Sequence, residues 1–481
     1  MIRVLLVSLL TFSVQCSSTS RKPSSTDSTI IQEETQKYIA TVSSPDYNKD
    51  SCGAILGSLQ TNLKNLDWNA YTNDDLKANA AKTAGLFWQL RSGIHKKLSE
   101  VGKDCILQAR DVFHMLRDGE DYLGEFAYNV AALNPADLDF QKQAVPIYNR
   151  KAYPPYFVRT DLDDPKFVFK SGDLMLARGV SFISAIISQI SDNHSHYSHV
   201  VFVNVDQKTF VPSTVEAYVG VGSKEYEMDF ALKNENARLL VLRPKSAELG
   251  VAAAGYAMKA ANTRIAYDYN MNFKDYSVMS CVEVAVYAYD KASKGALKIP
   301  MFPAQLNLKN DDFLGKMSLQ RGSLVTPDDL ETDPNFEMVL DWKDYRLVRD
   351  SRHKDAILSE MMRWLDQLQY KFHDTPKSWV AKNIVQPSRK TPLWPLVQKL
   401  LGAPDIDKEI PRKTLGVMTV LNDIGNTLLV EIKKQDEAYI SRHHRPMTNQ
   451  QLRESLERFR QGDLAKYNNG EKSLVHKALR P

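Results

Sequence analysis

The sequence predicts an α+β protein in which a central antiparallel sheet is flanked by two helical regions. Short runs rich in β-branched residues follow one another between about residues 172 and 242, and turn residues separate them. A helical apolar periodicity covers the chain before and after this stretch. The strands are also followed by a helix predicted to begin near Ser280, and strands gathered around one helix are typical of an α+β domain.

The composition is that of a soluble globular protein. The chain has 481 residues, of which 43% are hydrophobic and 25% charged, so it is long enough for two or three domains. Its 62 basic and 58 acidic side chains are spread along the chain. Because no one-sided basic region stands out, we exclude nucleic acid as a partner.

The N-terminus has the features of a secretory signal peptide over residues 1–18. Met1-Ile2-Arg3 precedes an apolar run from Val4 to Val14, which is too short to span a bilayer. Cys16 stands where a lipoprotein cysteine would, but Gln15 before it is bulkier than the small residue usual there, so lipidation and membrane association stay open. We expect an exported protein of the bacterial periplasm or cell envelope without a membrane-spanning helix.

The rest of the chain divides into four parts. Residues 19–45 are rich in Ser, Thr, Lys and Gln, and we expect a disordered tether. Residues 46–150 and 346–481 are predicted to be helical, because apolar residues recur there at spacings of three and four, and the polar end after residue 466 is expected to fray. Residues 151–345 form the predicted α+β domain.

The elements of this central domain follow from local patterns. Apolar runs bounded by turn signals predict strands at residues 172–177, 200–205, 214–219 and 239–242. Apolar side chains at helical spacing predict helices at residues 181–190, 247–261 and from Ser280 onward.

Four cysteines need an explanation: Cys16, Cys52, Cys105 and Cys281. Cys52 and Cys105 could pair in an oxidising compartment, which would leave Cys281 as an odd thiol in an exported chain. The spacings support no zinc site of the Cys-x-x-Cys kind.

Cys281 is predicted to lie at the start of a helix, with Ser280 as its N-cap. Unpaired backbone N–H groups there, together with a nearby imidazole, would lower the pKa of a thiol and activate it as a nucleophile. The N–H of Cys281 could also stabilise an oxyanion. The alternative is that Cys281 is a small buried hydrophobe beside Val282 and Val284.

His199 and Glu216 are the candidate partners of this thiol. His199 opens the apolar run 200–203, so its ring can point along the sheet edge toward a helix end and take the thiol proton. Glu216 stands among β-branched residues of the next strand and needs a partner if it is buried, which the far nitrogen of His199 would supply. A structural His199 and a solvent-facing Glu216 are the alternative.

His194, His196 and His199 could also be interpreted as a metal cluster. Alternating strand geometry would not hold all three on one site, and no carboxylate lies at a ligand spacing, so we predict neither a metal nor another cofactor. We expect His194 and His196 in a loop at the rim of the cleft, with His196, Tyr267 and Tyr269 as candidate substrate-binding residues. The two tyrosines could equally be packing residues.

The order of these motifs resembles that of the circularly permuted papain-like hydrolases of the NlpC/P60 superfamily, specifically the YiiX/YaeF-like amidases. The motifs are Gly172-Asp173-Leu174, Ser198-His199-Val200, Val215-Glu216-Ala217, Tyr267-Asp268-Tyr269 and Ser280-Cys281-x-Glu283, followed by Ile299-Pro300 and Pro303. The resemblance covers roughly residues 165–345 and neither helical region. Ser198, the long interval between His199 and Cys281 and the helical additions depart from the family pattern.

The resemblance implies a catalytic triad, with Cys281 as nucleophile, His199 as base and Glu216 as the residue that orients His199. Members of the superfamily cleave amide bonds of cell-wall peptides or transfer and hydrolyse acyl groups of lipids. We therefore expect an exported cysteine amidase or peptidase that acts on peptidoglycan-type peptides. The alternatives are a lipid acyl-ester or thioester hydrolase or acyltransferase with the same triad, and a non-catalytic envelope scaffold whose helices bind a partner.

Overall fold

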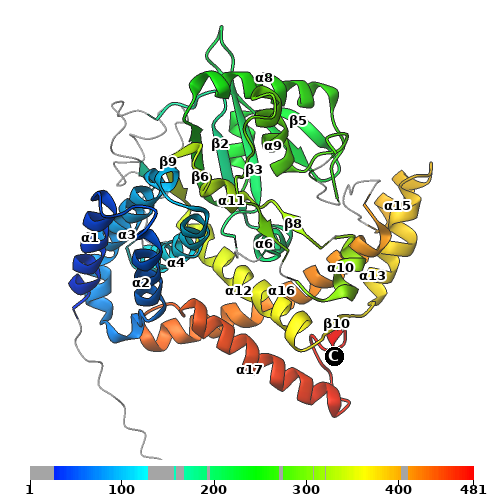
Figure 1. Cartoon of the computed structure of the whole chain (residues 1–481). Helices are drawn as coiled ribbons and strands as arrows, with labels where there is room; N and C mark the ends of the chain where they lie inside the picture. The colour runs from blue at the N-terminus through cyan, green and yellow to red at the C-terminus, as the bar shows by residue number, and fades with distance from the viewer. Residues whose placement is uncertain are drawn as a thin grey trace, which may run out of the picture.

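The computed structural model describes residues 27–127, 156–158, 167–191, 195–269, 273, 275–306, 308–319, 321–401 and 410–481. The predicted α+β fold class is confirmed, because one antiparallel sheet lies among helices from both ends of the chain. Figure 1 shows the N-terminal helices, in blue, at one side of the sheet and the C-terminal helices, in yellow to red, below it. The predicted signal peptide, Cys16 and His194 lie outside the described residues.

The central sheet has seven strands in the order β1-β9-β6-β2-β3-β4-β5, and each neighbouring pair is antiparallel. Its strands are β1 Tyr156–Val158, β2 Leu174–Gly179, β3 His199–Val205, β4 Pro212–Tyr218, β5 Gly222–Glu227, β6 Asn236–Pro244 and β9 Phe336–Lys343. Two further pairs of short strands are β7 Ala304–Gln305 with β8 Ser323–Leu324, and β10 Lys371–Phe372 with β11 Leu479–Arg480. The strands predicted from apolar runs are β2, β3, β4 and β6.

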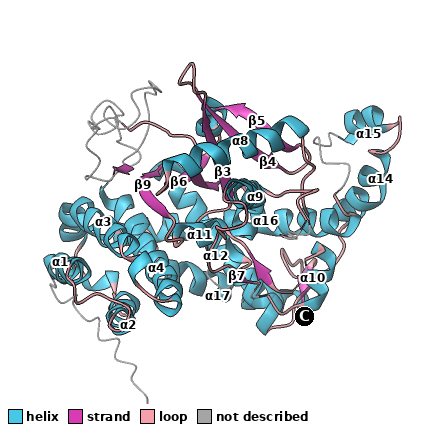
Figure 2. Cartoon of the chain, turned by 45° about the horizontal axis from the view of Figure 1, so that its top comes forward, coloured by secondary structure: helices cyan, strands magenta, loops and turns pink. Residues whose placement is uncertain are grey.

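The central strands are continuous runs of apolar residues because both of their faces are buried. In β3, Val200 and Phe202 pack toward α8 (Ala247–Thr263) and α9 (Cys281–Ala292). Val201 and Val203 belong to the core of the opposite face, which the short helix α7 (Met228–Lys233) helps to cover. Figure 2 shows α8 and α9 lying together across one face of the sheet.

Two glycines let α8 come close to the loop before β2. Gly172 has φ +91°, and a Cβ added to it would lie 2.4 Å from the Cα of Gly250 in α8. The backbones therefore touch, which side chains at either position would prevent. The Tyr289 hydroxyl of α9 donates a hydrogen bond of 2.6 Å to the Gly172 carbonyl and fixes the same corner.

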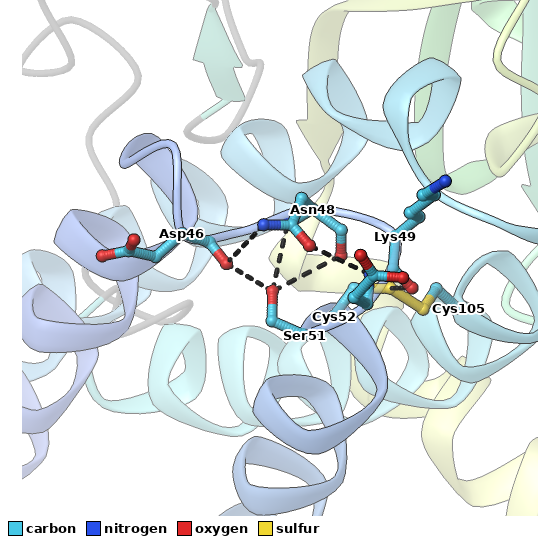
Figure 3. Close-up of a disulfide and its surroundings, with 7 residues drawn as sticks. Asp46, Asn48, Lys49, Ser51, Cys52 and Cys105 are labelled. Carbon is cyan, nitrogen blue, oxygen red and sulfur yellow. Dashed lines mark hydrogen bonds between the residues drawn. A yellow bond between two sulfur atoms is a disulfide. The ribbon is translucent and has the colours of Figure 1, made fainter.

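The N-terminal helices are α1 Thr29–Ser43, α2 Cys52–Lys64, α3 Asn73–Lys96 and α4 Lys103–Ala127. A disulfide joins Cys52 of α2 to Cys105 of α4, with a Cα–Cα distance of 6.0 Å (Figure 3). Figure 3 also shows the turn before α2, where the Asn48 carbonyl accepts a 2.9 Å hydrogen bond from the Cys52 N–H. Closing a loop of this length stabilises a fold by about 4 kcal/mol in the chain-entropy model.

The prediction of a disordered tether over residues 19–45 is wrong for the described part, residues 27–45, because most of that part is helix α1. Ile31 and Val42 are buried against the neighbouring helices, and α1 packs along α3. Polar residues take part in this packing, since the Gln32 amide donates to Asn79 at 3.1 Å and to Thr83 at 3.2 Å. A polar composition such as that of residues 19–45 is typical of disorder. Here, however, polar side chains of α1 form hydrogen bonds across the interface with α3.

A network of buried charges joins the N-terminal helices to the sheet. Arg91 of α3 is fully buried and forms ion pairs with Glu120 of α4 at 3.2 Å, with Glu331 of α11 (Pro327–Glu331) at 3.0 Å and with Asp341 of β9. Lys343 of β9 also contacts Glu120, at 2.6 Å. The contacts of Arg91 with Glu331 and Asp341, and that of Lys343 with Glu120, join segments that are more than 200 residues apart in the sequence. The described part of the predicted helical region, residues 46–127, is therefore packed into one core with the sheet.

A second core lies among the C-terminal helices. Ile357, Met361 and Trp364 of α12 (Tyr345–Gln367) pack with α16 (Arg412–His443) and with α6 (Phe182–Gln189), which reaches over from the central domain. The remaining helices are α6 Phe182–Gln189, α10 Asp311–Met317, α12 Tyr345–Gln367, α13 Pro376–Val380, α14 Gln386–Ser388, α15 Trp394–Leu401, α16 Arg412–His443 and α17 Asn449–Asn468. Among the described helices, α16 is long and apolar enough to cross a membrane, but half of its apolar window is buried in this core.

The end of the chain is ordered, which corrects the expectation that it frays after residue 466. Strand β11 pairs with β10, and Val475 and Leu479 are buried. The Asp463 carboxylate accepts hydrogen bonds from the backbone N–H groups of Leu474, Val475 and His476 at 2.7–3.0 Å. One buried acceptor thus fixes a segment whose composition is that of a loop.

Candidate active site

The nucleophile candidate is the first residue of α9. Cys281 is 6% exposed, and Ser280 before it has the extended backbone of an N-cap residue. The Ser280 N–H donates a 2.7 Å hydrogen bond to the Glu283 carboxylate, which closes a capping box. The Cys281 thiol therefore lies at a helix N-terminus, where the N–H groups of Val282 and of Val200 in β3 favour a thiolate.

His199 and Glu216 lie together beside this thiol. His199 is the first residue of β3, and its Nε2 lies 2.9 Å from the Glu216 carboxylate of β4. This leaves the other ring nitrogen for the thiol of Cys281, which is close enough for the imidazole and the thiol to affect each other's pKa. The structure thus brings Cys281, His199 and Glu216 into one chain of contacts.

The thiol and the imidazole shift each other's pKa. Burial by itself would raise the pKa of Cys281, but the charge and hydrogen bond of His199, with the N–H groups of Val200 and Val282, lower it overall. Burial would likewise lower the pKa of His199, but the Cys281 thiolate and the Glu216 carboxylate raise it to about 10. Each shift favours the charged form of its own group, so the thiolate and the imidazolium stabilise one another.

Glu216 is held by two hydroxyl groups on the same face of β4. Its side chain is fully buried and accepts hydrogen bonds from Thr214 at 2.9 Å and from Tyr218 at 2.6 Å. Tyr218 also stacks on His199, with ring centroids 4.9 Å apart and an interplanar angle of 25°. Thr214 and Tyr218 were not predicted as site residues, although their spacing of two from Glu216 on a strand is a signal for a shared face.

A small pocket of about 20 Å³ opens beside Cys281. Most of its lining side chains are apolar, and the lining residues are Ile187, Ile190, Tyr267, Ser280, Cys281, Val282, Leu324, Val325, Thr326 and Pro327. The pocket lies between α9, α6 and the segment around β8. An apolar group bound there would lie next to the thiol.

The three candidate substrate-binding residues are placed differently from one another. Tyr267 lines the pocket with Cys281. Tyr269 packs edge-on against Tyr267, with ring centroids 5.2 Å apart, and is not among the pocket residues. His196 corrects our expectation of a residue at the rim of the cleft, because it is 4% exposed and packs against α4. The predicted helices alone gave no indication that α4 would cover this loop.

A pair of carboxyl groups lies directly behind the nucleophile. Glu283 and Asp268 are both buried, and burial followed by the charge and hydrogen bond of Asp268 raises the pKa of Glu283 to about 7, against the hydrogen bonds from Ser280. The raised pKa means that the Glu283 carboxyl group binds its proton more tightly in the folded protein than in the unfolded chain. Ionisation of Glu283 therefore lowers the stability of the fold. The free energy of unfolding therefore falls as the pH rises from about 4.5 to 7.

We expect Glu283→Gln to remove this pH dependence, because glutamine keeps the capping acceptor but cannot ionise. The rise in the pKa of Glu283 from 4.5 to about 7 corresponds to about 3 kcal/mol in the free energy of unfolding. The variant should gain up to this amount over the wild type at pH 8 and differ little from it at pH 5, as measured by urea unfolding at both pH values. An equal difference between the two proteins at both pH values would contradict the assignment.

The comparisons with known proteins give a structural similarity but no similarity in sequence. No protein-family model matches the chain, and no curated protein matches it in sequence. Among solved structures, the chain is similar to the crystal structure of metalloprotein yiiX from Escherichia coli O157:H7, with 19% identity and a TM-score of 0.29. The match covers 35% of this chain and 96% of that one. Membership of the NlpC/P60 superfamily stays a prediction.

Proposed function

We propose that this protein is a cysteine hydrolase that cleaves its substrate through a covalent acyl-enzyme on Cys281. The observation that carries the proposal is the contact chain from Cys281, at the start of α9, through His199 to the buried Glu216. A thiol with a lowered pKa, an imidazole and a carboxylate that orients it are the parts that nucleophilic catalysis by cysteine needs.

Each residue then has a defined role. The Cys281 thiolate attacks the substrate carbonyl, and backbone N–H groups at the start of α9 stabilise the oxyanion. The His199 imidazolium gives its proton to the leaving group, and the neutral ring then takes a proton from the water that releases the acyl group. Glu216 keeps the ring oriented through Nε2 and is itself fixed by Thr214 and Tyr218.

The substrate we propose is an amide of a peptidoglycan-type peptide, in keeping with export to the cell envelope. The disulfide between Cys52 and Cys105 supports an oxidising compartment. A second candidate is an acyl ester or thioester, whose acyl chain would suit the mostly apolar lining beside Cys281. The pocket would have to widen for this substrate, because about 20 Å³ holds about one water molecule.

Substrate panels separate these two activities. Purified protein is incubated with peptidoglycan peptides in one series and with acyl esters of increasing chain length in the other, and mass spectrometry follows both product release and acylation of Cys281. Release from the peptides alone supports the amidase, and release that improves with acyl chain length supports the second candidate. If no substrate of either class acylates Cys281, the scaffold alternative gains support.

We expect Glu216→Gln to lower kcat about tenfold to hundredfold. Glutamine still offers an oxygen to the His199 Nε2–H but removes the negative charge, and hydrogen bonds to charged groups contribute about 1.5–3 kcal/mol. The exposed Glu225→Gln on the neighbouring strand is the matched control and should leave kcat unchanged. Equal turnover by both variants would remove Glu216 from the catalytic machinery.

A further inference from the structure

His196 meets two residues of α4 in a cluster that has no part in the proposed hydrolysis. His114 and Asp118 are four residues apart on α4 and therefore share one face of that helix. His196 approaches this face from the segment that leads into β3. One donor atom from each of the three side chains lies within 4.8 Å of the other two.

The spacing within this cluster fits ligands of one metal ion. His196 Nε2 lies 3.3 Å from one Asp118 oxygen, and His114 Nε2 lies 3.5 Å from the other. With metal–ligand bonds of about 2.0–2.1 Å, neighbouring ligands of a zinc tetrahedron are about 3.3–3.4 Å apart. Charge-assisted hydrogen bonds are shorter, at about 2.7–2.9 Å.

His196 is buried in this cluster. Its side chain is 5% exposed, and its Nδ1 has no hydrogen-bond partner among the described residues. The loop itself is fixed by Asp328, whose carboxylate accepts hydrogen bonds from Ser195 Oγ at 2.5 Å and from the His196 N–H at 2.9 Å.

We propose that His114, Asp118 and His196 form a binding site for a divalent transition metal ion, with Zn²⁺ as the best match to two imidazoles and one carboxylate. The side chains of His114 and Asp118 are 27% and 34% exposed, so water can reach the site and fill a fourth position. A bound ion would join α4 to the segment three residues before His199. The site includes no residue of the proposed triad and is independent of the proposed hydrolase activity.

The test measures zinc binding to the full chain, prepared without a histidine tag and treated with a chelator. It uses the Cys281→Ala background, because a thiolate–imidazole pair could bind zinc by itself. Titration calorimetry with ZnCl₂ should give about one ion per chain, and zinc should raise the thermal unfolding temperature by mass action. Binding of Co²⁺ with the absorption spectrum of a tetrahedral site is expected as well.

Variants of the half-exposed ligands decide whether these three residues bind the ion. His114→Ala and Asp118→Asn should each weaken zinc binding by at least about tenfold to hundredfold. This is the loss of affinity typical when an outer-shell partner of a metal ligand is removed, and removing a ligand itself should cost no less. His443→Ala, which removes an exposed histidine of α16, is the matched control and should bind zinc like its parent. Circular dichroism checks that each variant is folded. No binding by the parent, or equal binding by all three variants, would overturn the proposal.

Discussion

Replacing Cys281 with serine is expected to lower turnover about 10⁴-fold or more, because members of a catalytic triad act as a unit and losing the nucleophile removes the covalent route. Serine is close to cysteine in size and can keep the hydrogen bonds at the start of α9. Its hydroxyl does not ionise near neutral pH, so the variant has no counterpart of the thiolate nucleophile.

Turnover is measured on whichever substrate the panels identify, and alanine at the same position serves as a second variant. Both variants should keep the far-ultraviolet circular dichroism of the wild type and differ from it only in kcat. Alanine also removes the thiolate that raises the pKa of His199, so that pKa should fall, which NMR titration of the ring can follow. Turnover that survives in both variants would exclude Cys281 as the nucleophile.

The second large effect concerns stability. Arg91→Met is expected to lower the free energy of unfolding by about 3–5 kcal/mol, since it leaves buried carboxylates of Glu120, Glu331 and Asp341 without their shared cation. Methionine fills a similar volume, so the loss reports on charge more than on a cavity. Urea unfolding at pH 8 measures the effect.

Arg321→Met provides the control for this prediction. Arg321 forms an ion pair of 2.6 Å with Asp311, but the two side chains are 58% and 85% exposed. Exposed pairs contribute less than about 1 kcal/mol, so this variant should unfold close to the wild type. Equal losses in the two arginine variants would mean that the Arg91 network does not hold the N-terminal helices against the sheet.

Local patterns were sufficient to predict the strands and helices that carry the site. The apolar run after His199 is β3, the Val-Glu-Ala motif lies in β4, and the Ser-Cys pair begins α9. Such elements can be predicted because each buries an apolar face that is visible as a period in the sequence. Their mutual approach was an inference from the order of motifs, since no periodicity reports which strand lies next to which helix.

The polar contacts between distant segments could not be predicted in the same way. Nothing in the local sequence distinguishes Arg91 from a solvated arginine. Its burial depends on the carboxylates of Glu331 and Asp341, which are more than 200 residues away in the sequence. His196 was interpreted together with its sequence neighbours His194 and His199, whereas it contacts His114 and Asp118 of α4. Burial of a charged or polar side chain depends on tertiary partners, which a single sequence does not reveal.

The most direct test of the central claim is the pH dependence of Cys281 alkylation by iodoacetamide, followed on the Cys281 peptide by mass spectrometry. The wild type, His199→Ala and the exposed-histidine control His443→Ala are compared. We predict that Cys281 in the wild type and the control titrates well below the thiol reference of about 8.5 and loses that reactivity in His199→Ala. A Cys281 that titrates near or above that reference in all three proteins would contradict the thiolate–imidazolium pair and identify a structural thiol.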